Sequence, residues 1–149
     1  MFANCQLMGT DMGFPDVCLT PAPPSPSPIP IPYPNVAMGP MAIPNCPTIL
    51  IMGAPAHNLG TTIPMTNGDN PGIALGVASG TVMGPSRHVT GAFTILLNGM
   101  PASRLTSMSL QNSTNVPLTR MTTFNLQNST NCPGARVVPS QTLVLMLAP

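Results

Sequence analysis

Proline and glycine are spread so densely along this chain that they decide which secondary structure it can form. The 149 residues include 21 prolines and 13 glycines. One or the other interrupts almost every stretch before Leu105, and each proline inside a helix costs about 3 kcal/mol. The longer windows free of both, 104–116 and 118–132, are rich in Ser, Thr and Asn, which favour turns and caps. We therefore expect an all-β, loop- and turn-rich fold.

Residues 21–34 form the most proline-rich segment, with eight prolines in fourteen positions. Because proline fixes φ and lacks an N–H donor, this segment is expected to be an extended arm. It could serve as a semi-rigid spacer or as a ligand for an aromatic groove. The apolar residues Ile29, Ile31 and Tyr33 favour instead an arm that lies on its own domain.

A strand unit is repeated along the chain. Residues 48–61 and 94–107 match at seven of fourteen positions, at an offset of 46 residues. A weaker third copy spans 136–149, where residues 142–149 resemble 94–101. Each copy consists of a turn with Gly or Pro, a short irregular link, and then Thr followed by three aliphatic residues. Such an apolar run is typical of a buried or half-buried strand. We expect the units Ile49–Ile51, Ile95–Leu97 and Leu143–Leu145 to build the core and part of one end, with pseudo-threefold symmetry that suits a partner trimer.

A second, local duplication relates residues 109–115 to 125–131, sixteen residues apart. We interpret 104–131 as a loop enlarged by a tandem insertion, since loops tolerate added length. The whole chain, 1–149, is expected to be a single domain.

Charged residues make up only 5% of the chain, and Lys and Glu are absent. Four scattered arginines cannot form the basic patch that nucleic-acid binding needs. Three Asp and two His supply little acid–base chemistry, and no nucleophile motif is present, so we expect no enzyme activity. The N-terminus has neither a basic region nor an apolar run, so we expect synthesis in the cytoplasm without a signal peptide.

Several phrases together resemble PAAR-like proteins. The segments Pro101–Arg104 and Pro55–Asn58 follow strand units and are similar to the Pro-Ala-Ala-Arg signature. The wider phrases MGFPDVCLTPAP, PAHNLGTTIPMTNGDNPG, GTVMGPSRHVTGA and NCPGARVVPSQT look like the PAAR-like group found beside type VI secretion and related contractile injection machines. Neither copy spells the tetrapeptide in full.

This resemblance implies a small conical all-β fold whose broad base caps a trimeric spike of the valine-glycine-repeat type. The point of the cone would meet the target membrane first, and the tip could carry effectors or adaptors out of the cell with the spike. The alternative is a free module that binds a metal or a peptide through the proline-rich arm.

PAAR cones often hold one metal ion near the apex through His and Cys, which implies a zinc site here. A structural zinc takes four nitrogen or sulfur ligands. The chain offers two histidines and four cysteines, and no Cys-x-x-Cys pair. We predict the set Cys18, His57, His88 and Cys132; the alternative is that these are ordinary turn and core residues. The twelve methionines are dispersed, which favours packing over copper binding.

Overall fold

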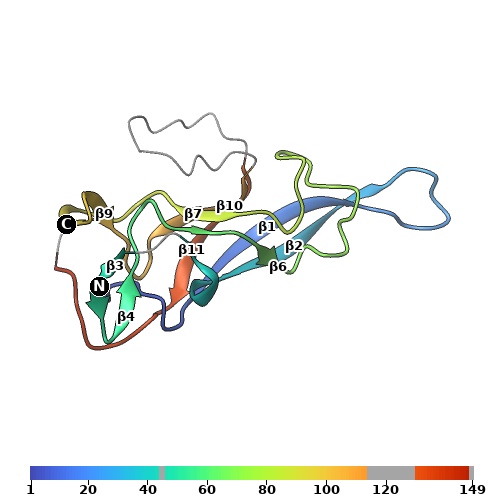
Figure 1. The fold of residues 1–149 in the computed structure, drawn as a ribbon. Helices are drawn as coiled ribbons and strands as arrows, with labels where there is room; N and C mark the ends of the chain where they lie inside the picture. Colours follow the sequence, from blue (N-terminus) through green and yellow to red (C-terminus); the bar gives the residue numbers. More distant parts are fainter. Residues whose placement is uncertain (44–45, 114–129, 148–149) are drawn as a thin grey trace.

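The structure, a computed structural model, describes residues 1–43, 46–113 and 130–147 (Figure 1). In these residues the regular structure is β-strand, apart from one 3-10 turn at Gly39–Met41. The strands are β1 (Thr10–Thr20), β2 (Ile29–Met38), β3 (Cys46–Ile51), β4 (Ala54–Ala56), β5 (Thr62–Ile63), β6 (Thr66–Asn67), β7 (Ser86–His88), β8 (Ala92–Leu97), β9 (Met100–Ala102), β10 (Met108–Ser113) and β11 (Thr130–Val138). No helix in the described residues is long and apolar enough to span a membrane. The all-β expectation is confirmed.

Seven strands form one sheet that curls almost into a barrel. Their order is β5-β7-β10-β11-β1-β2-β6, and the two edge strands β5 and β6 are close neighbours in the sequence. The β1–β2 hairpin is the longest element and projects beyond the rest of the sheet. In Figure 1 the molecule is broad where β3, β4, β9 and the N-terminus gather, and it narrows toward the tip of this hairpin. The conical shape follows from this arrangement.

Two small hairpins at the broad end show that the 46-residue repeat is structural. In β3–β4, Ile51 pairs with Ala54, and in β8–β9, Leu97 pairs with Met100, at equivalent positions. Both hairpins turn through two residues with positive φ, Met52–Gly53 and Asn98–Gly99. Such a two-residue turn matches the twist of the flanking strands. Strands β3 and β8 also share one pattern of burial along their six residues.

The third unit differs from the sequence expectation in its register and its partner. Residues 143–145 do not form a regular strand; Leu145 makes an isolated bridge to Phe2. The burial pattern aligns Gln141–Met146 with Ala92–Leu97, one residue later than the sequence match suggested. The first residues of the chain therefore close the third hairpin, which has no connecting turn. The sequence match failed here because it aligned threonines, whereas packing aligns Met146 with Leu97.

The proline-rich arm lies on its own domain. Its second half, 29–34, belongs to β2 and pairs with β1 from Thr20 back to Asp16. Residues 21–28 connect the two strands at the narrow tip. A spacer or a free groove ligand would not be paired in this way, so the third of the three interpretations holds.

The predicted loop 104–131 is partly sheet. Its residues 108–113 form β10, which pairs with β7 and β11, and its last two residues begin β11. Thr and Ser are compatible with strands when their side chains find partners, which composition alone cannot show. The middle of the duplication, 114–129, lies outside the described residues.

The interior divides into an apolar base and a polar barrel. The apolar core cluster lies at the broad end and includes Ala3, Cys5, Cys46, Ile51, Ala54, Ala56, Ala92, Leu97, Ala102 and Met146. Inside the barrel, β1 and β10 direct Asp11, Asp16, Ser109 and Gln111 inward, and all four are buried. Among the charged side chains that the structure describes, Asp11, Asp16, Asp69 and Arg136 are buried.

Candidate functional site

A ring of three backbone hydrogen bonds marks a pseudo-threefold axis through the base. The backbone N–H of Asn4 donates to the carbonyl of Ser103 (3.1 Å), and the N–H of Ser103 donates to the carbonyl of His57 (3.2 Å). The N–H of His57 donates to the carbonyl of Asn4 (3.0 Å), which closes the ring. The three residues occupy the same position in three Pro-Ala-x-x-like segments, 2–5, 55–58 and 101–104. The N-terminal segment, in which Phe2 replaces the proline, was missed as a copy by sequence comparison.

A second ring confirms this equivalence two residues away. The N–H groups of Gln6, Leu59 and Leu105 donate to the carbonyls of Pro55, Pro101 and Phe2, at 2.8–2.9 Å. Between the two rings lie three alanines with no exposed surface, Ala3, Ala56 and Ala102. A larger side chain at these positions would push the three segments apart, which explains why alanine is the shared residue of the motif.

In each sector of the base, an exposed leucine directly precedes a buried apolar residue. Leu50 and Leu96 are each 60% exposed, and Leu145 is 53% exposed. Their neighbours Ile51, Leu97 and Met146 are buried in the core. The exposed leucines pair across the hairpins with Pro55, Pro101 and Phe2, respectively. The base thus carries three equivalent apolar positions around one axis.

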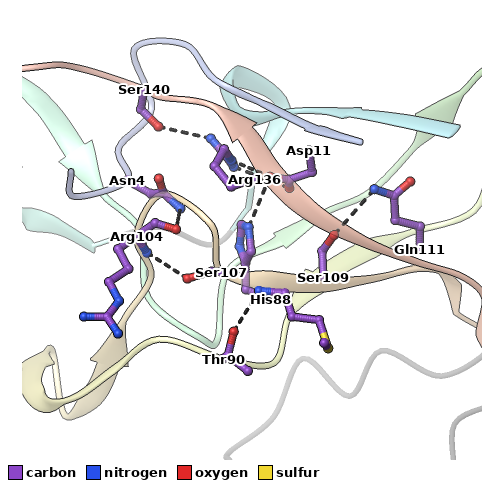
Figure 2. Close-up of polar contacts among 11 residues, drawn as sticks. Asn4, Asp11, His88, Thr90, Arg104, Ser107, Ser109, Gln111, Arg136 and Ser140 are labelled. Atoms are coloured by element: carbon purple, nitrogen blue, oxygen red, sulfur yellow. Dashed lines mark hydrogen bonds and ion pairs between the residues drawn. The ribbon is translucent and has the colours of Figure 1, made fainter. Parts of the chain in front are cut away.

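Above the base, a buried ion-pair network joins three strands (Figure 2). Asp11 of β1 accepts hydrogen bonds from Arg136 Nε and Nη2 of β11, and Arg136 Nη1 donates to Ser140 Oγ (3.0 Å). His88 Nε2 of β7 lies 3.2 Å from Asp11 Oδ1. Burial alone would raise the pKa of Asp11, but His88 and Arg136 outweigh it and hold the pKa below its ordinary value. The network joins β1, β7 and β11 inside the barrel.

A second buried cluster surrounds Asp16 in the narrow half. Three asparagine amides donate to this carboxylate: Asn35 Nδ2 at 2.8 Å, Asn112 Nδ2 at 2.6 Å, and Asn131 Nδ2. Asn112 Nδ2 also lies 2.6 Å from Asp69 Oδ2. Asn112 and Asn131 come from the two copies of the local duplication, so each copy supplies a group to one site.

The Asp16 cluster contains the atoms of a possible metal site. Single ligand atoms of Asp16, Cys18 and Asp69 lie within 4.8 Å of one another, and all three residues are buried. Asp69 Oδ1 is buried without a hydrogen-bond partner, which is costly for a carboxylate oxygen. Burial is the main cause of two pKa shifts in this cluster. It raises the pKa of Asp16, and it raises the pKa of Cys18 to about 12. A bound cation would offset both effects, because it favours the ionised ligands.

The four predicted zinc ligands do not form one such group in the described part of the chain. Cys18 lies in the Asp16 cluster, and the nearby Cys132 has its pKa raised to about 12, mainly by burial. His88 belongs to the Asp11 network, and His57 Nε2 lies 2.8 Å from Gln6 Oε1 on the base axis. The structure thus brings the two cysteines into one half of the cone and places the histidines nearer its base.

Sequence reasoning missed Asp16 and Asp69 as candidate ligands, along with the three asparagines. Asp16 was visible as a charge two residues before Cys18 in a chain with only three acidic residues. The duplicated Asn-Ser-Thr triplets were also visible, but nothing in the sequence indicates that Asn112 and Asn131 meet across β10 and β11.

Comparison with known families agrees with the geometry of the base. The family model described as the toxin PAAR-like domain matches residues 9–118, about three quarters of the chain. The chain belongs to the toxin PAAR-like domain family. No curated protein and no solved structure matches it. The family assignment associates this PAAR-like protein with the spikes of type VI secretion.

Proposed function

We propose that this PAAR-like protein is a non-enzymatic tip that caps a trimeric spike of the valine-glycine-repeat type, one tip to three spike chains. The pseudo-threefold base carries this proposal. A single chain that matches three identical partners must present similar surfaces three times around one axis. The two hydrogen-bonded rings and the leucines Leu50, Leu96 and Leu145 provide that repetition.

The leucines also supply the contact energy. Full burial of an exposed leucine contributes roughly 1.5–3 kcal/mol, and three equivalent leucines multiply that gain without any ion pair. No Asp or Arg lies within three residues of Leu50, Leu96 or Leu145 in the sequence, so the docking is expected to depend little on salt. The role of the protein would be mechanical: it would end the spike in a rigid point and leave the cell with the spike.

The test is native mass spectrometry of the chain co-expressed with a valine-glycine-repeat spike protein. A complex of three spike chains and one tip is expected for the wild type. The triple variant Leu50→Asp, Leu96→Asp, Leu145→Asp should abolish it, and Leu50→Asp alone should weaken it. Val77→Asp, an equally exposed site in the narrow half, is the matched control and should leave it intact. A wild-type tip that stays free beside intact spike trimers would overturn the proposal.

We also propose that the narrow half holds one divalent cation, with zinc the ion suited to a ligand set containing a thiolate. Cys18, Asp16 and Asp69 are the candidate ligands that geometry favours. The set Cys18, His57, His88 and Cys132 remains the sequence prediction. Elemental analysis separates them: Asp69→Asn should remove bound zinc in the first arrangement only, and the double variant His57→Ala, His88→Ala in the second only. Purified protein without stoichiometric metal would refute both.

A further inference from the structure

The wall of the barrel has its polar and apolar sides reversed. In an antiparallel sheet with one solvated face, apolar residues point to the core and polar residues point to water. Here the inward positions of β10, β11, β1 and β2 carry polar or charged side chains, and these are buried: Ser109, Gln111, Arg136, Asp11 and Asn35. Successive side chains of a strand point to opposite faces, so the alternate residues of the same strands point outward, and most of these are apolar.

The outward residues lie side by side over these four neighbouring strands (Figure 1). Met12 of β1 is near the centre, because it pairs with Ala135 of β11 on one side and with Val36 of β2 on the other. Ala135 pairs in turn with Met108 of β10. We call this surface the outer wall, and it comprises Thr10, Met12, Phe14, Val36, Met38, Met108, Leu110, Pro133, Ala135 and Val138.

The outer wall is exposed and carries no charge. Met12, Met38, Met108 and Val138 are between 44% and 51% exposed. None of the residues of the outer wall is ionisable, and Arg87, which pairs with Leu110, lies beyond it on β7. A contiguous apolar patch of several hundred Å² on the surface of a soluble protein marks an interaction site.

The chemistry of the outer wall favours a partner that is also a flat, apolar and uncharged sheet. Two sheets pack face to face about 10 Å apart, with the side chains of the two faces interdigitated. The outer wall of a second copy meets these conditions, because it brings no charge that would repel the first or lose its water on contact. The flexible methionines Met12, Met38 and Met108 can also adapt to an identical surface. A twofold axis would then repeat every contact.

The size of the outer wall sets the expected strength of such a contact. A large apolar side chain offers on the order of 100 Å² when it is fully exposed. With its largest side chains about half exposed, the outer wall offers roughly 400–500 Å² per copy, or up to about 1,000 Å² in a pair. A specific interface needs about 1,000 Å² in total. The area therefore suits a reversible dimer with a dissociation constant in the micromolar range.

We propose that two copies of this chain form a dimer in which their outer walls pack face to face, with Met12 near the twofold axis. The dimer goes beyond the proposed function and does not depend on it, because the outer wall shares no residue with the three leucines of the base. Pairing removes from water the apolar surface that the polar interior of the barrel leaves outside.

The experiment is sedimentation velocity of the purified chain, without a spike protein, over a micromolar concentration series at low and at high salt. The wild type is expected to pass from monomer to dimer equally at both salt concentrations, since no ion pair contributes. Met12→Asp should weaken the dimer at least about a hundredfold, because two carboxylates would meet in an apolar contact. The matched control is Met52→Asp, since Met12 and Met52 are both 47% exposed and Met52 lies in the β3–β4 turn at the base. Met52→Asp should dimerise like the wild type.

A mixture of two variants tests the arrangement itself. Met12→Asp and Met12→Arg should each be monomeric, and mixing them should restore a dimer, because opposite charges then meet near the axis. Circular dichroism melts verify that each variant is folded. A wild type that stays monomeric, growth beyond two copies, equal loss in Met52→Asp, or no recovery in the mixture would overturn the proposal.

The spike complex separates this proposal from the proposed function. Met12→Asp should still bind three spike chains, because its base is unchanged. A monomeric wild type that forms the spike complex would refute the dimer alone. A dimer that forms as predicted, from a chain that does not bind the spike, would refute the tip alone.

Discussion

His57 makes the stability of this protein depend on pH in a way that one substitution should remove. The side chain is buried on the base axis, and burial, assisted by Arg136 and His88, lowers its pKa from 6.5 to about 3. As the pH falls below 6.5, His57 therefore binds a proton in the unfolded chain but stays neutral in the folded chain. Stability is lost progressively until the pH approaches 3. Between about pH 7.5 and 5.0 this linkage amounts to about 2 kcal/mol.

The perturbation is His57→Asn, because Asn4 already occupies the equivalent position in another sector. Urea unfolding followed by circular dichroism, in buffer with a chelator, gives the free energy of unfolding at each pH. The variant loses the contact between His57 and Gln6, so the comparison uses the pH dependence of stability and not its value at neutral pH. That dependence should be smaller by about 2 kcal/mol over this range. Ser103→Asn introduces the same residue at a non-titrating equivalent site and should keep the wild-type dependence. Equal pH dependence in wild type and His57→Asn would refute the reasoning.

Two further predictions concern the packing of the barrel. Gly72→Ala would place a Cβ 2.2 Å from Cys18 Cβ. The control is Gly99→Ala, whose site has a positive φ but open space and where a loss of about 1 kcal/mol is expected. Gly72→Ala should lower the free energy of unfolding by more than that, and similar melting temperatures for the two variants would contradict this. Arg136→Met would leave Asp11 buried beside His88 alone and should cost about 3–5 kcal/mol. Adding Asp11→Asn should recover part of that loss in chemical denaturation, and strictly additive effects would show that the pair is not coupled.

The fold class and two sectors of the base could be predicted from sequence because they depend on local signals. Proline and glycine exclude helices wherever they fall, and the repeated run with its turn specifies the β3–β4 and β8–β9 hairpins. The third sector could not be predicted, because its two strands come from opposite ends of the chain. Only packing shows that Phe2 stands where Pro55 and Pro101 stand.

The candidate metal site was predicted in part for a related reason. Cys18 was predicted as a candidate ligand from its residue type and the family resemblance, and it lies in the cluster that the structure forms. Its neighbours Asp16 and Asp69 come together through the bridge between Cys18 and Gly76 and the asparagines of β2, β10 and β11. Such convergence depends on the register of the sheet, and a one-residue shift would turn these side chains outward.

The pseudo-threefold base has a consequence for how the cone is seated. A base with three similar sectors can settle on a threefold partner in three settings that differ by one third of a turn. Leu50, Leu96 and Leu145 are the same in each setting, whereas the adjacent positions Met52, Asn98 and Leu147 differ. If those differences are small in energy, the three settings coexist and add about 0.7 kcal/mol of mixing entropy to binding. An exposed side chain that is not repeated in the other sectors, such as Val77, would then face three directions across a population of assembled spikes.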